Sequence, residues 1–438
     1  MQGLSPLHTK KHLGFKALRK TISKRLRQIQ DPRKGALDYS LHDCFMSGFA
    51  MMFFQDPSLL QFQQRLQKRF NRNNLKNFFH ITDIPKDSQL RQVLDDADNA
   101  NLYELFADLF RSLQRGKHLD LFRFSDDRYL LCLDGSAYFS SDTIHCPGCL
   151  TKTSAKGHVR YEHQILQPVI VCPGIREVIP LAPEPIANTD GAQKQDCEIN
   201  AAKRLIGKLR QTHPKLKLVV TADSLYSKQP FIDCLKAAGM AFILVAKPDD
   251  HKILFQEFAD QKGLDAVSTY SFKDVKGRQH LYEWIHQIPL NGTKDADNVN
   301  FLQYSLFVGA KRTYHNSWVT DIDITKDNVI DLVKAGRARW KVENECFNTL
   351  KNQGYHLEHN FGHGQNNLSM TFFLLNLLAF FVHQIMQLTD RPYQQCRSTF
   401  SSRIEFWNQL RCSIRVLIFA DFEHLLSFII DPPESRAP

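Results

Sequence analysis

Helical spacing of apolar residues dominates the first third of the chain. The three segments in which apolar side chains recur every three or four positions are 56–70, 87–97 and 101–116. The first opens with Asp56, a suitable N-cap, and Pro57 at the first helical position, and the third ends at Gly116, a common residue after a helix. No segment before about residue 128 has a strand pattern. The sequence therefore predicts an α-helical N-terminal region.

Beyond that point the pattern changes to short apolar runs rich in β-branched residues. Strands are expected at 128–135, 161–173, 177–186, 216–223 and 241–248, and helices at 195–211 and 228–239. Three strands followed by alternating helices and strands indicate a mixed α/β sheet with helices on its faces. A polar, β-prone stretch follows, with a hairpin predicted at 268–285 and a further strand at 300–310. Helical spacing returns near Asp327.

The most apolar run, 368–388, is long enough to cross a bilayer. It contains Ser369, Asn376, His383 and two glutamines, so we interpret it as a buried core helix and expect no membrane partner. The ten cysteines are scattered through apparently buried segments, and no secretory leader opens the sequence. Both features favour a reducing cytoplasm. A chain of 438 residues with 43% hydrophobic content can bury a substantial core, in two or three domains.

Positive charge is concentrated near the N-terminus. The net charge is +10, and residues 1–40 carry ten Lys or Arg against two Asp. A second segment, 61–80, has five basic residues and no acid. Lys and Arg that neutralise phosphates release counterions and supply most non-specific affinity, so we expect nucleic acid to bind here. A solvated basic surface is the alternative for either segment alone. The candidate DNA contacts in the second segment are Arg65, Lys68, Arg69 and Arg72.

Two of the predicted strands end abruptly in an aspartate, Asp134 in LLCLDG and Asp223 in VVTADS. Ligands of open α/β sheets bind at the carboxyl ends of strands, so these side chains could lie side by side if their strands are neighbours. Either aspartate alone could instead cap the turn after its strand.

A third acid lies on a predicted helix, 337–352. At 100° per residue, the apolar side chains of this helix fall within an arc of about 160°. Glu343 and Arg339 lie near the centre of the arc, and Glu345 lies on the opposite face. A carboxylate in an apolar stripe costs several kcal/mol unless it is paired, neutralised or bound to metal. Glu343 is therefore either an internal partner of Arg339 or a third metal ligand.

Two aspartates and a glutamate supply the oxygen ligands that Mg²⁺ prefers, and Mg²⁺ also binds substrate phosphates. Two such ions about 4 Å apart would hold the attacking and leaving oxygens of a phosphodiester displacement. The hypothesis is a two-metal centre in which Asp134, Asp223 and Glu343 are both the metal ligands and the catalytic residues. Mn²⁺ could replace Mg²⁺ at such a centre.

These motifs resemble those of the DDE transposases of bacterial insertion sequences, specifically the insertion-sequence-four family. The third acid of that family lies on a helix reading Tyr-x2-Arg-x3-Glu-x6-Lys, which this chain matches at Arg339 and Glu343. Asp223 and Tyr226 match the second motif, Asp-x2-Tyr, and Asp134 matches the first acid.

Two departures from the family pattern leave the register of the third motif open. Gly336 stands where the family has Tyr, and the Lys falls one place late, at Lys351. With Glu345 as the acid, Lys351 would come one place early. Spacing alone does not decide between the two glutamates, and the helical face favours Glu343.

The resemblance covers roughly residues 125–385 and implies an RNase H-like mixed sheet flanked by helices, with a β-rich insertion between the second Asp and the Glu. The organisation expected from it is a basic α-helical DNA-binding region at 1–125, the first part of the catalytic core at 126–250, the β-rich insertion at 251–320, the third-acid helix and the end of the core at 321–390, and a helical C-terminal tail at 391–438.

The resemblance also implies an activity, namely metal-dependent cleavage at the ends of an insertion sequence and transfer of the freed 3′-hydroxyl to target DNA. The partners would be double-stranded DNA, both transposon ends with terminal inverted repeats and target, and a second copy of the chain in a synaptic homodimer at the bacterial nucleoid. Arg339, Tyr226 and Lys351 would contact DNA, and Arg339 would also orient Glu343. Two alternatives stay open: an RNase H-like nuclease or resolvase that does not join ends, and an inactive DNA-binding remnant.

A second group of candidate ligands follows the first acid. The spacing Cys146-x2-Cys149-x8-His158-x4-His163 is compatible with a tetrahedral zinc site, although the middle gap is shorter than in a usual finger. A pair of reduced thiols at a tight turn is the alternative.

Three further histidines, His356, His359 and His363, lie just beyond the third-acid helix. Their Gly-rich context indicates a loop close to the acids, with contacts to DNA phosphates or to the loop itself in preference to metal binding.

Overall fold

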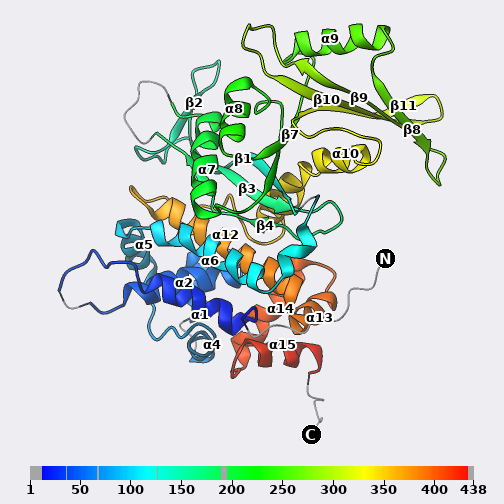
Figure 1. Cartoon of the computed structure of the whole chain (residues 1–438). Coiled ribbons are helices and arrows are strands. Elements are labelled where there is room, and N and C mark those ends of the chain that lie inside the picture. The colour runs from blue at the N-terminus through cyan, green and yellow to red at the C-terminus, as the bar shows by residue number, and fades with distance from the viewer. Residues whose placement is uncertain (1–11, 36, 67–68, 126, 189–194, 433–438) are drawn as a thin grey trace.

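The computed structural model describes residues 12–35, 37–66, 69–125, 127–188 and 195–432, with the side chains of residue 66 and of 69–72 left outside the description. The N-terminal helices, blue to cyan in Figure 1, and the C-terminal helices, orange to red, gather on one side of the molecule. The sheet and its own helices form the other side.

The N-terminal region is helical, as the apolar spacing predicts. Its helices are α1 (Phe15–Leu26), α2 (Leu41–Phe53), α3 (Leu59–Leu66), α4 (Arg69–Phe79), α5 (Asp87–Asp96) and α6 (Ala100–Arg115), followed by the 3-10 turn η1 (His118–Phe122). Helix α2 was not expected from periodicity, because every residue from Cys44 to its end is buried and no polar face remains.

The predicted core helix is α12 (Leu368–Thr389), which contacts α2, α5, α6 and α13. In the described part of the chain it is the one helix long and apolar enough to cross a membrane, and 89% of its most apolar stretch is buried inside the protein. The prediction of a buried core helix is confirmed. The chain ends in three further helices, α13 (Arg391–Ser398), α14 (Arg403–Val416) and α15 (Phe422–Ile430).

One mixed sheet contains the eleven strands found among the described residues, in the order β2-β3-β1-β6-β7-β11-β10-β9-β8, with β4 and β5 paired to β3. The strands are β1 (Tyr129–Ser141), β2 (Leu150–Thr153), β3 (Val159–Val171), β4 (Ile179–Pro180), β5 (Glu184–Ile186), β6 (Leu218–Ala222), β7 (Ala241–Val245), β8 (Ser268–Lys273), β9 (Gln279–Pro289), β10 (Asn298–Val308) and β11 (Lys311–Thr320).

The first half of the sheet has the RNase H-like arrangement. Strand β3 is antiparallel to β1 and to β5, whereas β6 is parallel to β1 and β7 is parallel to β6. The crossovers are helices α7 (Glu198–Thr212), which packs on β3 and β5, and α8 (Gln229–Ala237), which packs on β7. Strand β1 is therefore central, with an antiparallel neighbour on one side and a parallel neighbour on the other.

The β-rich stretch between the second aspartate and the third acid extends this same sheet. Helix α9 (Lys252–Gly263) leads into the antiparallel strands β8 to β11, and β11 pairs with β7. The predicted hairpin is present as β8 and β9, with Gly277 at positive φ in the turn. Strand β11, which was not predicted, returns from β10 through Gly309.

The predicted helix 337–352 is interrupted. Helix α10 (Val329–Arg337) ends at a turn, and the chain then forms a π-helix, η2 (Val342–Phe347), before the short helix α11 (Asn348–Asn352). A π-helix closes i→i+5 hydrogen bonds, so it holds more residues per turn than an α-helix and shifts the side chains that follow onto different faces.

Candidate active site and Cys/His cluster

Asp134 and Asp223 lie on neighbouring parallel strands. The register between β1 and β6 runs to Cys132 opposite Thr221, and continuing it by two residues sets Asp134 level with Asp223. The predicted strand end at residue 135 is wrong, because β1 continues to Ser141 along β3. Asp134 nevertheless lies where the parallel partner β6 ends, at the carboxyl edge expected for a ligand site.

Asp223 also has a local structural role. Its Oδ1 accepts a hydrogen bond from the backbone N–H of Leu225 at 2.9 Å, and its carbonyl accepts one from the N–H of Tyr226. The turn-capping alternative therefore holds for one oxygen of this carboxylate. Both aspartates are half-buried, so each is in reach of solvent.

Glu343 lies in η2, and its side chain is exposed. The prediction that it is buried at the centre of an apolar stripe is wrong, because the stripe was drawn at 100° per residue and η2 does not follow that period. Trp340 is also exposed, and it lies before η2, next to the turn that interrupts the helix. Burial therefore no longer argues that Glu343 binds metal. Its charge still acts on Asp134, where it is the smallest of the influences on the pKa of that carboxyl.

Burial and the neighbouring charges shift the pKa of Asp134. Burial raises it from the ordinary range to about 6. The positive charge of Arg339 acts against the increase, and the negative charges of Glu198, Asp223 and Glu343 add to it. The charges of three other carboxylates and of one guanidinium thus act on Asp134. Glu345 faces elsewhere and lies 3.6 Å from the guanidinium of Arg176.

The segment that carries Glu343 is fastened to the sheet just below the acids. Element η2 contacts β1 and β3. In the turn before it, the carbonyl of Ala338 accepts a hydrogen bond from the thiol of Cys132 at 3.5 Å, and Cys132 is two residues before Asp134. The turn and the first acid are therefore held together through buried groups.

Glu198, at the start of α7, is a fourth acid of the site. A side chain at position 135 would place its Cβ 2.5 Å from Glu198 Oε2, so the glycine of the LDG motif permits this close approach. Burial raises the pKa of Glu198, a hydrogen bond from the hydroxyl of Tyr226 lowers it, and the charge of Asp223 raises it. An acid in the first turn of a helix is favoured by the helix dipole alone, so the sequence position of Glu198 does not mark it as a site residue.

Tyr226 itself was predicted to contact DNA, and that prediction is corrected. Its side chain is 1% exposed, and its hydroxyl is bound to Glu198. A group at that depth cannot reach a bound nucleic acid, so Tyr226 positions Glu198 instead.

Lys351 lies one position further from Glu343 than the family spacing, and this difference has a physical explanation. The π-helix between Glu343 and Lys351 accommodates an additional residue, so a spacing of seven intervening residues reaches the face that six would reach in an α-helix. Lys351 is 2.9 Å from Glu358 in an ion pair, and its contact with DNA stays a prediction. Gly336, where the family has Tyr, lies against the indole of Trp318, whose Nε1 would be 2.5 Å from an added Cβ.

The structure places only one of the candidate DNA-contact side chains at 61–80, that of Arg65. Arg65 is 6% exposed and forms a buried ion pair with Asp56, so the prediction that it contacts DNA is wrong. Asp56 is likewise not the N-cap of α3, which begins at Leu59. Lys68 lies outside the described residues, as do the side chains of Arg69 and Arg72.

A basic groove of about 470 Å³ lies instead between α1 and α6. Its charged lining comprises Lys24, Arg25, Asp108, Arg111 and Arg115. Asp108 pairs with Arg25 and with Arg111, so the groove has a surplus of positive charge with two of its cations held in place.

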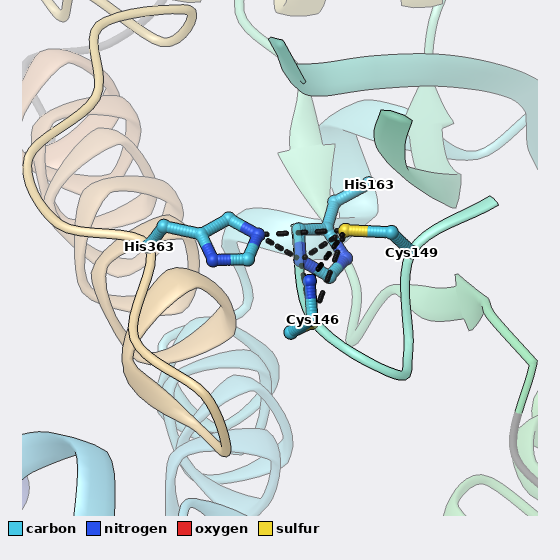
Figure 2. Close-up of side chains that lie close together, drawn as sticks. All are labelled: Cys146, Cys149, His163 and His363. Carbon is cyan, nitrogen blue, oxygen red and sulfur yellow. Dashed lines mark hydrogen bonds between the residues drawn. The ribbon is translucent and has the colours of Figure 1, made fainter. Parts of the chain in front are cut away.

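Four sulfur and nitrogen ligands converge beside the sheet, as Figure 2 shows. Cys146 and Cys149 come from the turn between β1 and β2, His163 from β3, and His363 from the loop between α11 and α12. Their ligand atoms all lie within 4.8 Å of one another, and in the described part of the chain this is the group compact enough to hold a metal ion.

Three of the four residues predicted as zinc ligands lie in this cluster, and the fourth does not. His158 is 61% exposed and lies 3.5 Å from Asp142, away from the thiols. His363, which was assigned to a loop near DNA, takes the fourth position at 3.4 Å from the sulfur of Cys149. The spacing could not identify it, because His363 is 214 residues from Cys149 in the sequence.

Comparison with solved structures finds chains of similar fold. The chain matches no protein-family model, and no curated protein sequence matches it. Over 99% of its length it superposes on 86% of a chain in the structure of a piggyBac transposase synaptic complex with hairpin DNA, with a TM-score of 0.45 and 11% identity.

Proposed function

We propose that this protein is a DDE-type transposase that cleaves DNA at the ends of a bacterial insertion sequence and transfers the freed 3′-hydroxyl to target DNA. The observation that carries the proposal is that Asp134 and Asp223 lie level on the paired parallel strands β1 and β6, at the end of β6. The charge of Glu343, which acts on Asp134, supports its place as the third acid. The similarity of their motifs to the insertion-sequence-four family supports it. The proposed partners are double-stranded DNA and a second copy of the chain in the bacterial cytoplasm.

The donor set is suited to hard cations. Asp134, Asp223 and Glu343 offer carboxylate oxygens only, and the pKa of Asp134 is raised because its charged form is partly desolvated among other acids. A cation would relieve that repulsion. Two bound Mg²⁺ or Mn²⁺ ions would supply the Lewis acidity that brings together the attacking and leaving oxygens of a phosphodiester.

The chain's own residues set the geometry of this site. Strand pairing fixes the two aspartates, and the hydrogen bond from the N–H of Leu225 orients the second of them. Glu343 is at the exposed rim, where it can swing toward a phosphate or an ion without a large desolvation cost. Half-buried Arg339 stabilises the carboxylate form of Asp134 and is close enough to the acids to bind a DNA phosphate.

The groove between α1 and α6 is the proposed contact with the DNA flanks. Its cations belong to helices that contact each other, so they present a fixed pattern of charge to a phosphate backbone. Such contacts position DNA and carry no sequence information by themselves.

The test is a strand-transfer assay with purified full-length protein. A labelled duplex made from the DNA that flanks the coding region is incubated with a supercoiled target plasmid and Mg²⁺. We expect labelled product joined to the plasmid, and no product from Asp134→Ala or Asp223→Ala. Cleaved duplex without joined product would support a nuclease or resolvase and overturn the transposase proposal. Unchanged activity in both variants would overturn the proposed site.

A further inference from the structure

We infer that Cys146, Cys149, His163 and His363 form a structural zinc site that fastens the loop after α11 to strand β3 and to the turn between β1 and β2. This inference does not depend on the proposed function, since it rests on the geometry of the four side chains alone. It replaces the ligand set that sequence spacing suggests.

The distances between the donor atoms match the edges of a zinc tetrahedron. Zn–S and Zn–N bonds of about 2.3 and 2.05 Å give edges of about 3.8 Å between sulfurs, 3.6 Å between sulfur and nitrogen, and 3.3 Å between nitrogens. The two sulfurs are 3.8 Å apart. The Nε2 of His163 is 3.5 Å from each sulfur, and the Nε2 of His363 is 3.4 Å from Cys149 Sγ. The two Nε2 atoms are 3.1 Å apart.

Hydrogen bonding among the four groups does not explain this arrangement. The Nε2 of His163 faces two sulfurs and a nitrogen within 3.5 Å, yet an imidazole nitrogen carries at most one hydrogen. The Nδ1 of His363 donates to the carbonyl of Gly364 at 2.7 Å, which leaves its Nε2 with a lone pair directed at the cluster. A cation at the centre would satisfy all of these lone pairs together.

The ligand types select the metal. Two thiolates and two imidazoles in a tetrahedron are the donor set of structural zinc, whereas Mg²⁺ takes oxygen ligands. All four positions are supplied by the protein, which is the mark of a structural site and not a catalytic one. Cys149 and His363 are 5% and 7% exposed, and the ring of Phe139 lies 4.5 Å from that of His363, so this side of the site is closed to water. Cys146 and His163 are half-buried.

The site would join parts of the chain that are far apart in sequence. The loop that contains His363 follows α11, and its far end is held separately by Asp95, which accepts hydrogen bonds from the backbone N–H groups of Gln365 to Leu368. The metal would hold the loop at His363, and Asp95 holds it at residues 365–368. Together they would fix the path of the chain from Glu343 to α12. Zinc would thereby limit the movement of the third acid relative to β1.

The test begins with the metal content of the purified full-length protein, measured by inductively coupled plasma mass spectrometry. We expect about one zinc ion per chain in the wild type and less than about a tenth of that in Cys149→Ser and His363→Ala. The matched controls are His158→Ala, at the ligand predicted from spacing, and His359→Ala, at an exposed histidine of the same loop. Both controls should retain zinc at the wild-type level.

A second measurement does not require that a variant folds. Wild-type protein freed of metal by a chelator is titrated with Co²⁺, and a tetrahedral site with two thiolates gives intense visible bands and a sulfur-to-cobalt charge-transfer band. Metal-free wild-type protein without these bands, or His363→Ala protein that keeps its zinc, would overturn the inference. Loss of zinc in His158→Ala would do so too, because it would return the fourth position to the residue predicted from spacing.

Discussion

The hydroxyl of Tyr226 donates a hydrogen bond to the carboxylate of Glu198, which joins the turn after β6 to the first turn of α7. Asp223 lies in the same turn as Tyr226, and its charge raises the pKa of Glu198. The hydrogen bond therefore stabilises the charged form of Glu198, which burial and the charge of Asp223 disfavour.

Tyr226→Phe should destabilise the protein in a pH-dependent manner. The hydroxyl favours the charged form of Glu198, so its removal raises the pKa of Glu198 further and costs about 1–3 kcal/mol when the carboxylate is charged. At pH 8 we expect that loss in the free energy of urea unfolding, and at pH 4, where Glu198 is largely protonated, a smaller one. Tyr270→Phe on β8 is the control. An equal loss at both pH values would contradict this assignment.

Asp134→Asn should stabilise the metal-free protein while it abolishes activity. A carboxyl with a folded pKa of about 6 binds its proton more tightly in the folded state than in the unfolded state, so stability falls as pH rises from about 4 to above 6. With partial solvent screening, the variant should gain roughly 1–2 kcal/mol at pH 8 and nothing at pH 4. Urea unfolding at both pH values in a chelator measures this gain. The exposed Asp249→Asn serves as control, and a destabilised Asp134→Asn at pH 8 would refute the prediction.

Glu343→Gln and Glu345→Gln should differ sharply in strand transfer. Loss of Glu343 should lower the rate by more than the about 10- to 100-fold that follows removal of a residue which only supports a metal ligand. Glu345 pairs with an exposed arginine, and such surface pairs contribute about 0–1 kcal/mol, so its variant should remain active. Initial rates with Mg²⁺ test this. The reverse order would move the third acid to Glu345.

Asp95→Asn should loosen the loop before α12. One carboxylate accepts four backbone N–H groups there, and although burial raises its pKa, these bonds outweigh it and hold the pKa of Asp95 below its usual range. That stability is present above about pH 4 and is lost as pH falls through the lowered folded value. We expect a loss of about 1–3 kcal/mol at pH 7, with faster hydrogen exchange at residues 365–368. The exposed neighbour Asp96→Asn should change neither quantity.

The sheet and its two aspartates could be predicted because their signals are local. An apolar run that stops at an acid is visible within eight residues, and the alternation of strands and helices gives their order. The sequence left the pairing of their strands as a condition, and the structure meets it, because β1 pairs in parallel with β6. Asp134 and Asp223 lie close together for this reason.

The exposure of the third acid, Glu343, and the place of His363 in the Cys/His cluster could not be predicted in the same way. The π-helix at Glu343 packs against β1 and β3, and these contacts are not visible in the local sequence. An α-helical period therefore predicted that the Glu343 side chain is buried, whereas it is exposed. Likewise, Arg65 belongs to a basic run, yet its buried partner Asp56 is determined by the tertiary fold. Charge and periodicity describe a segment, whereas burial depends on what the rest of the chain places beside it.

The separation of 214 positions between Cys149 and His363 has a consequence for biosynthesis. A ribosome that adds 5–20 residues per second needs about 10 to 40 s to proceed from one to the other. During that interval the nascent chain presents two neighbouring thiols and no completing histidine. With zinc bound only once His363 is available, we expect the newly made chain to be open to oxidation at this turn until residue 363 has emerged. Correct maturation would then require a reducing environment during synthesis.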